Sequence, residues 1–146
     1  MDANVEIRFF KPEDVNAVVG IQEAIIQRKV APDWLNLVKL QLAKEDAISL
    51  VAEKGGDVIG FFFGEIKHGH FGLENSGWIE MFGVMPKQMG EGVGRTLAEK
   101  AFQLFKERGV KEIYTATRWD SGDLLAFFKK IGFDLSDFIN LKTTLH

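Results

Sequence analysis

Residues 84–97 read VMPKQMGEGVGRTL and combine the end of a strand, a turn and the start of a helix. The apolar run 78–84 leads to Pro86, and glycines then occupy every second position, at Gly90, Gly92 and Gly94. Glycines let backbone N–H groups approach a ligand closely, and the unpaired donors of a helix N-terminus favour negative charge. The stretch therefore predicts a site for a phosphate-bearing cofactor.

Two common phosphate motifs do not fit this stretch. A P-loop needs Gly-Lys-Ser/Thr at the start of its helix, whereas Gly94-Arg95-Thr96 carries arginine and lacks the upstream glycine spacing. A dinucleotide fingerprint counted from Gly90 and Gly92 needs a third glycine where Arg95 stands. An alternative interpretation is a glycine turn that begins a helix and binds nothing.

The same stretch resembles the acetyl-CoA loop of the GNAT superfamily of acyltransferases. The family pattern is Arg or Gln, two residues, Gly, one residue, and then Gly or Ala. Gly92 and Gly94 match it, Met89 occupies the Arg/Gln position, and Gln88 stands one position early. Three further segments are similar to elements of the family, in the same order along the chain. They are residues 7–14, 51–61 and 124–133.

The resemblance implies the α/β GNAT fold, with a mixed central sheet of about six to seven strands and about four helices. In this family the sheet splays between strands four and five. Hydrophobic periodicity and turn residues predict where the elements lie in this chain. Strands are expected at residues 5–10, 48–53, 57–66, 78–84, 111–118 and 138–144. Helices are expected at residues 12–28, 32–42, 92–108 and 122–131.

Length and composition indicate a single globular domain over residues 1–146, with 46% hydrophobic and 27% charged residues. The net charge of −3 without basic clusters argues against nucleic acid as a partner. The absence of cysteine excludes disulfides and cysteine nucleophiles and is compatible with a cytoplasmic location. We expect no signal peptide and no membrane span, because the N-terminus lacks an apolar core and no apolar run is long enough.

The resemblance implies how acetyl-CoA is held as a co-substrate. The backbone of Phe82, Gly83 and Val84 is expected to pair with the pantetheine arm, and an N–H near Phe82 to polarise the thioester carbonyl. The pyrophosphate is expected on the loop N–H groups. That loop comprises Met89, Gly90, Glu91, Gly92, Val93, Gly94, Arg95 and Thr96. An amine acceptor, a small molecule or a peptide, then attacks directly in a ternary complex.

Glu80 is the candidate general base. A cationic amine cannot attack until a group or water chain removes its proton, and Glu80 lies two residues before Phe82 within an apolar strand. An unpaired carboxylate there would be costly to bury, so the alternative is a Glu80 that faces solvent or pairs with a neighbouring strand. Glu65 on the preceding strand is a second, weaker candidate.

The leaving-group side departs from the family pattern. The family often places a tyrosine acid on its last helix, where this chain has Phe128, and an asparagine before that helix, where it has Ser121. Both positions are expected to contact the cofactor. Water held by Ser121 offers an alternative acid, and Tyr114 is the only tyrosine in the chain. Phe128 also leaves open a non-catalytic acyl-CoA-binding or regulatory module.

Other signals in the sequence are weaker. His68, His70 and Glu74 offer metal ligands without a third or fourth at suitable spacing, so no metal site is expected. The serines lack the context of a hydrolase nucleophile. Residues 67–77 form the largest loop-like patch and are interpreted as a lid on the acceptor side. Residues 138–141 suit the C-terminal contacts through which many family members form homodimers.

Overall fold

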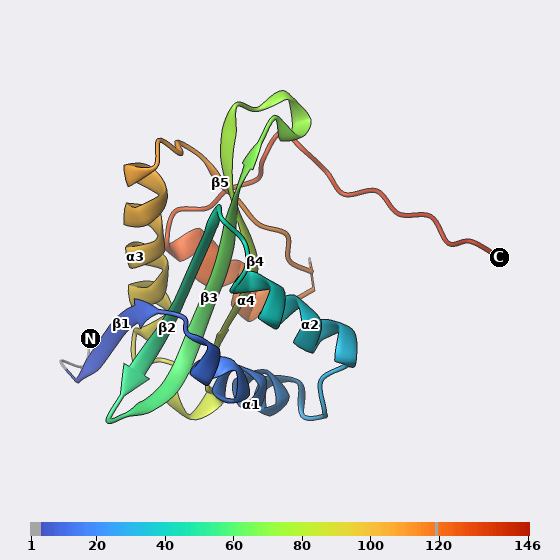
Figure 1. Cartoon of the computed structure of the whole chain (residues 1–146). Coiled ribbons are helices and arrows are strands. Elements are labelled where there is room, and N and C mark those ends of the chain that lie inside the picture. The colour runs from blue at the N-terminus through green and yellow to red at the C-terminus, as the bar shows by residue number, and fades with distance from the viewer. Residues whose placement is uncertain (1–3, 119) are drawn as a thin grey trace. The chain divides into compact units, whose positions relative to one another are not determined.

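The computed structural model describes residues 4–118 and 120–146 (Figure 1). The chain divides into two compact units, one that ends at Thr115 and one that begins at Ala116. In the described residues, no helix combines the length and apolar character needed to cross a membrane.

The first unit is built on a five-stranded mixed sheet with the strand order β1-β2-β3-β4-β5. Neighbours are antiparallel from β1 to β4, and β4 and β5 are parallel. The strands are β1 (Val5–Phe9), β2 (Ala47–Lys54), β3 (Asp57–His68), β4 (Asn75–Val84) and β5 (Ile113–Tyr114). The sheet confirms the predicted α/β class and the Gly-Gly hairpin between β2 and β3, whose turn glycines Gly55 and Gly56 both have positive φ.

The predicted number of six to seven strands is wrong, because one predicted strand is missing from the described residues, and a second is present but shorter than expected. The strand predicted at 111–118 shortens to Ile113–Tyr114, and residues 138–144 form no strand. A run of apolar residues becomes a strand only where a sheet edge offers it hydrogen bonds. In the described chain, Ile139 and Leu141 instead remain 82% and 88% exposed.

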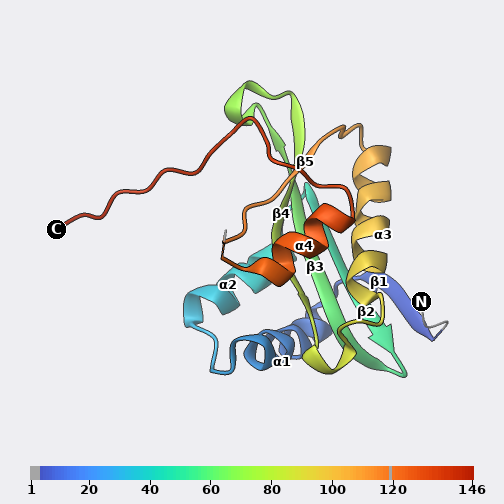
Figure 2. The same ribbon diagram turned by 180° about the vertical axis from the view of Figure 1, so that it is seen from behind.

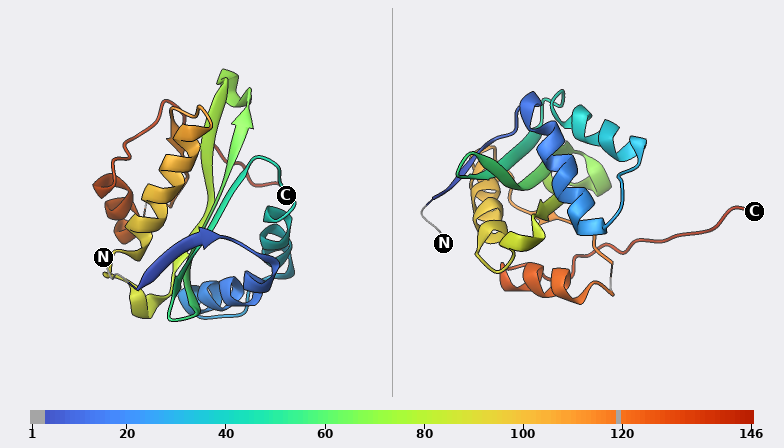
Figure 3. Two further views of the ribbon diagram at one scale, coloured as in Figure 1. Left: turned by 60° about the vertical axis from the view of Figure 1, so that its left-hand side comes forward. Right: turned by 90° about the horizontal axis from the view of Figure 1, so that it is seen from below.

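Helices cover both faces of the sheet in the first unit (Figure 3). α1 (Val15–Ile26) and α2 (Pro32–Gln41) lie on one face, and α3 (Val93–Glu107) lies on the other. Short 3-10 turns precede α1 and α3 and cap the β3–β4 hairpin; they are η1 (Pro12–Asp14), η3 (Pro86–Gln88) and η2 (His70–Gly72). α1 ends two residues before the predicted Arg28, because Gln27 takes a left-handed conformation with φ 61°.

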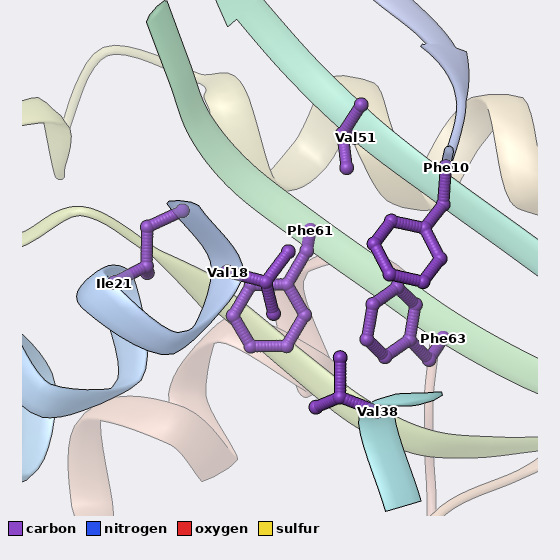
Figure 4. Packing of buried hydrophobic residues seen from close by; sticks show 7 residues of the cluster. All are labelled: Phe10, Val18, Ile21, Val38, Val51, Phe61 and Phe63. Carbon is purple, nitrogen blue, oxygen red and sulfur yellow. The ribbon is translucent and has the colours of Figure 1, made fainter. Parts of the chain in front are cut away.

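β3 lies at the centre of two cores. On the α1–α2 face, Phe61 and Phe63 pack with their ring centroids 5.2 Å apart in the cluster of Figure 4. That cluster also contains Phe10, Val18, Ile21, Val38 and Val51. On the α3 face, the ring centroids of Phe62 and Phe105 lie 6.5 Å apart. The three consecutive phenylalanines are at most 1% exposed, which confirms the prediction of a strand buried on both faces.

An ion-pair network fixes the start of α1 against the sheet. Arg8 of β1 contacts both carboxylate oxygens of Asp14 at 2.8 and 2.9 Å and Glu53 of β2 at 3.1 Å. The Lys11 N–H also donates to Asp14 at 2.8 Å. The hydrogen bonds from Arg8 lower the pKa of Asp14 below its ordinary value. The network therefore ties the start of α1 to the first two strands of the sheet.

The second unit contains α4 (Gly122–Lys130), followed by an extended C-terminal segment (Figure 2). The helix agrees with the predicted 122–131 to within one residue. Gly132 ends it with a positive φ of 110°, as expected of a glycine just past a helix C-terminus.

Candidate functional site

The backbone of the loop between β4 and α3 is not covered by other side chains at Gly90 and Gly92. Gly90 and Gly92 have left-handed conformations, with φ of 85° and 84°. A Cβ added at either glycine would meet no atom within 4 Å, so the space beside both is open. Met89, at the position where the family has Arg or Gln, is 58% exposed. The backbone of residues 90–95, open beside these two glycines at the N-terminus of α3, is called the cradle, and the Met89 side chain is largely exposed to solvent.

The N-terminus of α3 supplies hydrogen-bond donors to this cradle. The Gly92 carbonyl accepts from the N–H of Thr96 at 3.1 Å and from its hydroxyl at 2.9 Å. The N–H groups of Val93, Gly94 and Arg95 precede this bond and so have no acceptor in the helix. They find no backbone acceptor elsewhere in the described residues. Three adjacent donors at a positive helix end fit an anion such as a pyrophosphate.

The one acidic side chain of the loop is neutralised by its neighbours. Glu91 lies 3.3 Å from Lys54 Nζ at the end of β2. With its amide nitrogen turned toward Glu91, Gln88 donates to the same carboxylate at 3.0 Å. Arg95 pairs with Glu99 one helical turn on, at 3.0 Å. Glu91 is therefore held by a cation and an amide, which offsets its repulsion of a bound phosphate.

Phe82, Gly83 and Val84, the residues predicted to pair with the pantetheine arm, lie at the end of β4. These residues pair with β3, and the ladder to β5 consists of Gly77–Ile113 and Trp78–Tyr114. In the described residues of the first unit, β4 therefore has no β5 partner beyond Trp78. A Cβ at Gly83 would lie 2.8 Å from the Phe61 ring and 2.9 Å from Ile25 of α1, so α1 approaches the strand closely there. The splay and the pantetheine contacts stay predictions.

Glu80 occupies a bulge in β4. The register to β3 passes from Met81–Phe63 directly to Ile79–Gly64, which leaves Glu80 as the extra residue. Bulges re-aim a side chain and are over-represented beside active sites. The Glu80 carboxylate lies 3.3 Å from Lys67 Nζ of β3, and its side chain is 30% exposed. The carboxylate is thus paired and reachable, and its role as base stays a prediction.

Sequence reasoning missed Lys67, which pairs with Glu80, and Trp78, which Lys67 also contacts. Lys67 Nζ also lies 5.2 Å from the centre of the Trp78 ring, within cation–π distance. The Trp78 Nε1–H donates to Ser76 Oγ at 2.7 Å, and its ring stacks on Tyr114 at 4.9 Å and 23°. The sequence does place Trp78 and Glu80 two residues apart on one strand and Lys67 on the strand before it, and this spacing could have indicated that the three side chains lie near one another.

Glu65, the second candidate base, lies nearby on β3. It pairs in register with Trp78, and its carboxylate lies 3.7 Å from Lys44 Nζ. The two candidate carboxylates thus lie on adjacent strands, and each has its own lysine.

The predicted leaving-group residues belong to the second unit. Ser121 is the N-cap of α4 and makes no side-chain capping hydrogen bond. The Phe128 ring lies 5.5 Å from Phe127 and 5.1 Å from Phe133, both within that unit. Phe128 is thus part of an aromatic cluster. The contacts of Ser121 and Phe128 with a cofactor stay predictions.

The predicted lid is strand at both ends, with a turn at residues 69–74. β3 extends to His68 and β4 begins at Asn75, so the connecting turn is shorter than the expected 67–77. His68 bridges Asn75 Oδ1 at 2.6 Å and Asp46 Oδ2 at 3.1 Å, and these bonds raise its pKa above the ordinary value. In the described part of the chain, no three acidic or histidine side chains gather as metal ligands. The two ring nitrogens of His68 are thus occupied by hydrogen bonds to Asn75 and Asp46.

Comparison with known proteins gives one consistent family. The model of the Acetyltransferase (GNAT) family matches residues 19–133. A mycothiol acetyltransferase of Amycolatopsis mediterranei (strain U-32) is 35% identical over 92 residues, which cover 61% of this chain and 30% of that protein. An acetyltransferase of Pectobacterium atrosepticum is 26% identical over 137 residues, which cover 94% of this chain and 93% of the relative. The chain thus spans less than a third of the mycothiol enzyme.

A solved structure shows the same fold. The aminoglycoside acetyltransferase AAC(6')-Iy, in complex with the bisubstrate analog CoA-S-monomethyl-acetylneamine, superposes with a TM-score of 0.82 at 16% identity. The match covers 99% of this chain and 100% of that chain. The predicted fold is therefore confirmed, with five strands in place of the expected six to seven.

Proposed function

The chain belongs to the acetyltransferase (GNAT) family, and from this premise we propose that it transfers an acetyl group from acetyl-CoA to a primary amine. The amine nitrogen forms a bond to the acetyl carbonyl carbon, the carbon–sulfur bond breaks, and CoA leaves as the thiol. The ammonium form of the amine loses two protons, one to a base before attack and one as the amide forms, and the second is balanced by protonation of the departing thiolate. Attack takes place directly, with both substrates bound.

The observation that carries this proposal is the open donor set at the start of α3. The N–H groups of Val93, Gly94 and Arg95, behind the left-handed Gly92, fit the pyrophosphate of CoA. When bound, acetyl-CoA supplies an activated acyl group as a thioester. The chain contributes backbone pairing along Phe82, Gly83 and Val84, and an N–H near Phe82 aimed at the developing negative charge.

Glu80 is the proposed base for the acceptor amine. Its bulge position, partial exposure and ion pair with Lys67 leave the carboxylate accessible. An incoming amine can exchange with Lys67, because a partly exposed ion pair contributes only about 0.2–1 kcal/mol. Proton removal by a positioned carboxylate contributes roughly 10²–10⁴-fold to rate.

A second candidate is a non-catalytic acyl-CoA-binding or regulatory module on the same fold. Phe128 favours it, because a phenyl ring has no proton to give to a leaving thiolate and this ring packs with Phe127 and Phe133. Catalysis does not require that acid, since a thiol with a pKa of about 8.5 is a tolerable leaving group near neutral pH.

Three further aspects belong to the same proposal. Residues 1–146 act as one acyltransferase domain in the cytoplasm, without nucleic acid or membrane as a partner. The protein forms a homodimer through its C-terminal segment. This is supported by four large apolar side chains, each more than 80% exposed there, namely Leu135, Ile139, Leu141 and Leu145.

Thiol release from acetyl-CoA tests the enzymatic proposal. The purified chain is incubated with acetyl-CoA and a panel of primary amines, free CoA is followed with a thiol reagent, and the acceptor is examined by mass spectrometry. We expect CoA and acetylated amine in equal amounts, above a control without acceptor. Tight acetyl-CoA binding without any acetylated product would favour the non-catalytic module.

A further inference from the structure

We propose that the acceptor is a small zwitterion, with its amine a few bonds from a carboxylate, and that Lys67 is the residue that selects it. Glu80 receives the ammonium group and Lys67 receives the carboxylate. This inference rests on the proposed acetyl transfer and names the class of its acceptor. It is carried by the contacts of Lys67, which lie entirely within the first unit.

Lys67 stands between two partners. Its Nζ is 3.3 Å from the Glu80 carboxylate and 5.2 Å from the centre of the Trp78 ring. Its side chain is 25% exposed, against 30% for Glu80, so both charged groups are partly open to solvent. The pair therefore presents one cation and one anion next to each other at the proposed reaction centre.

Trp78 keeps Lys67 in place when Glu80 is taken by another cation. The indole is fixed at its Nε1 by Ser76 at 2.7 Å and on its face by the stacked Tyr114 at 4.9 Å. A fixed indole attracts an ammonium group through its negative face. Lys67 therefore keeps a partner at Trp78 after it gives up Glu80.

An acceptor ammonium bound at Glu80 is repelled by Lys67, and a carboxylate on the same acceptor can neutralise that lysine. Exposed ion pairs change an equilibrium by no more than about fivefold, so the acceptor can displace Lys67 from Glu80. The acceptor cation then lies beside the Lys67 cation, and like charges at short range repel. A carboxylate on the acceptor pairs with Lys67 and removes this repulsion.

The neighbouring charges argue against a polycationic acceptor. Glu65, the other carboxylate beside Trp78, is matched by Lys44 at 3.7 Å. Glu80 and Glu65 are thus each balanced by one lysine. A polyamine needs an excess of negative charge, and these four side chains provide none.

Matched acceptors test the inference. L-phenylalanine, L-leucine and β-alanine are compared with 2-phenylethylamine, 3-methylbutylamine and ethylamine, which lack the carboxylate, and with spermidine. We expect kcat/KM to favour each amino acid over its partner by roughly fivefold, the upper range of a partly exposed ion pair. Spermidine should be the poorest acceptor.

Variants then assign the preference to one side chain. Lys67→Met keeps an apolar stem over Trp78 and removes the charge, so the preference should fall to about one while the KM for acetyl-CoA stays unchanged. Lys67→Arg should restore it. Lys106→Met, the same change at an exposed position of α3, should leave it intact.

The outcomes separate this inference from the proposed function. Transfer to the simple amines without preference for their carboxylate partners contradicts the zwitterion alone, as does a preference that survives Lys67→Met. Acetylation of other primary amines without transfer to any of the amino acids likewise contradicts the zwitterion alone. Absence of transfer to these probes and to the whole amine panel contradicts the proposed acetyl transfer, and this inference with it.

Discussion

Gly92 and Gly109 flank α3 with nearly the same left-handed backbone, at φ of 84° and 80°, and both have open space where a Cβ would stand. Glutamate at either position costs roughly 1–2 kcal/mol of backbone strain. Only at Gly92 does the new carboxylate enter the cradle. Gly92→Glu should weaken acetyl-CoA binding by about 100-fold or more, because charged hydrogen bonds to the N–H groups of α3 are lost.

Gly109→Glu is the matched control for this prediction. Isothermal titration of both variants, together with their melting temperatures, separates loss of the cofactor from loss of fold. Equal affinity in the two variants would contradict the assignment of the loop as the pyrophosphate site.

Glu80 and Glu65 provide a second matched pair, since both are partly exposed carboxylates held by a lysine. Glu80→Gln keeps the size of the side chain and removes its basicity, so kcat should fall by roughly 10²–10⁴-fold. The affinity for acetyl-CoA should stay within a factor of two, since Glu80 does not belong to the loop. Steady-state kinetics and titration measure the two quantities. A loss of turnover in Glu65→Gln and not in Glu80→Gln would move the base to β3.

Among the elements, the start of α1 contributes a pH-dependent part of the folding stability, through the Arg8–Asp14 pair. Pairing lowers the folded-state pKa of Asp14 below 3.8, so the stability it adds is complete above that pH and is lost as the pH falls through the folded pKa. Asp14→Asn should lower the free energy of unfolding by about 2 kcal/mol at neutral pH. Urea unfolding should show this difference shrinking in acid. Glu13→Gln, with a side chain 72% exposed, should change little at any pH.

The β3–β4 hairpin has the opposite pH dependence through His68. Hydrogen bonds to Asn75 and Asp46 raise the pKa of His68 above its ordinary value of 6.5. The stability that these bonds add is therefore complete below pH 6.5 and is lost as the pH rises through the folded-state pKa. Asp46→Asn should move the His68 pKa down toward 6.5 in an NMR titration. Glu45→Gln, next to it, should leave the titration unchanged. An unmoved His68 in Asp46→Asn would contradict the contact.

Elements with a strong local pattern could be predicted from the sequence, and elements defined by distant partners could not. α3 carries its own helical periodicity and its terminal glycines, and β3 carries an apolar run buried on both faces. The bulge at Glu80 and its contact with Lys67 depend on the register between β3 and β4, which single residues do not encode. The strand expected at 138–144 was wrong because apolar residues alone do not supply a sheet edge.

For the molecule as a whole, the exposed C-terminal segment predicts the oligomeric state. Burying Ile139 and Leu141 in a homodimer gives each a favourable transfer of about 1.5–3 kcal/mol, which aspartate cannot provide. The double variant Ile139→Asp/Leu141→Asp should therefore be monomeric in light scattering at concentrations where the parent chain is a dimer. Leu37→Asp, on the 48% exposed Leu37 of α2, should remain dimeric. A monomeric parent chain would contradict the homodimer.

Isothermal titration of the intact chain with acetyl-CoA, with free CoA and ATP as comparisons, asks whether the cradle and β4 together bind the cofactor. We expect a dissociation constant in the micromolar range for acetyl-CoA and no heat with ATP, because the site combines the donors of α3 with a strand backbone that only the pantetheine arm can pair with. A folded sample that gives no heat with acetyl-CoA would contradict both the acetyltransferase and the acyl-CoA-binding module.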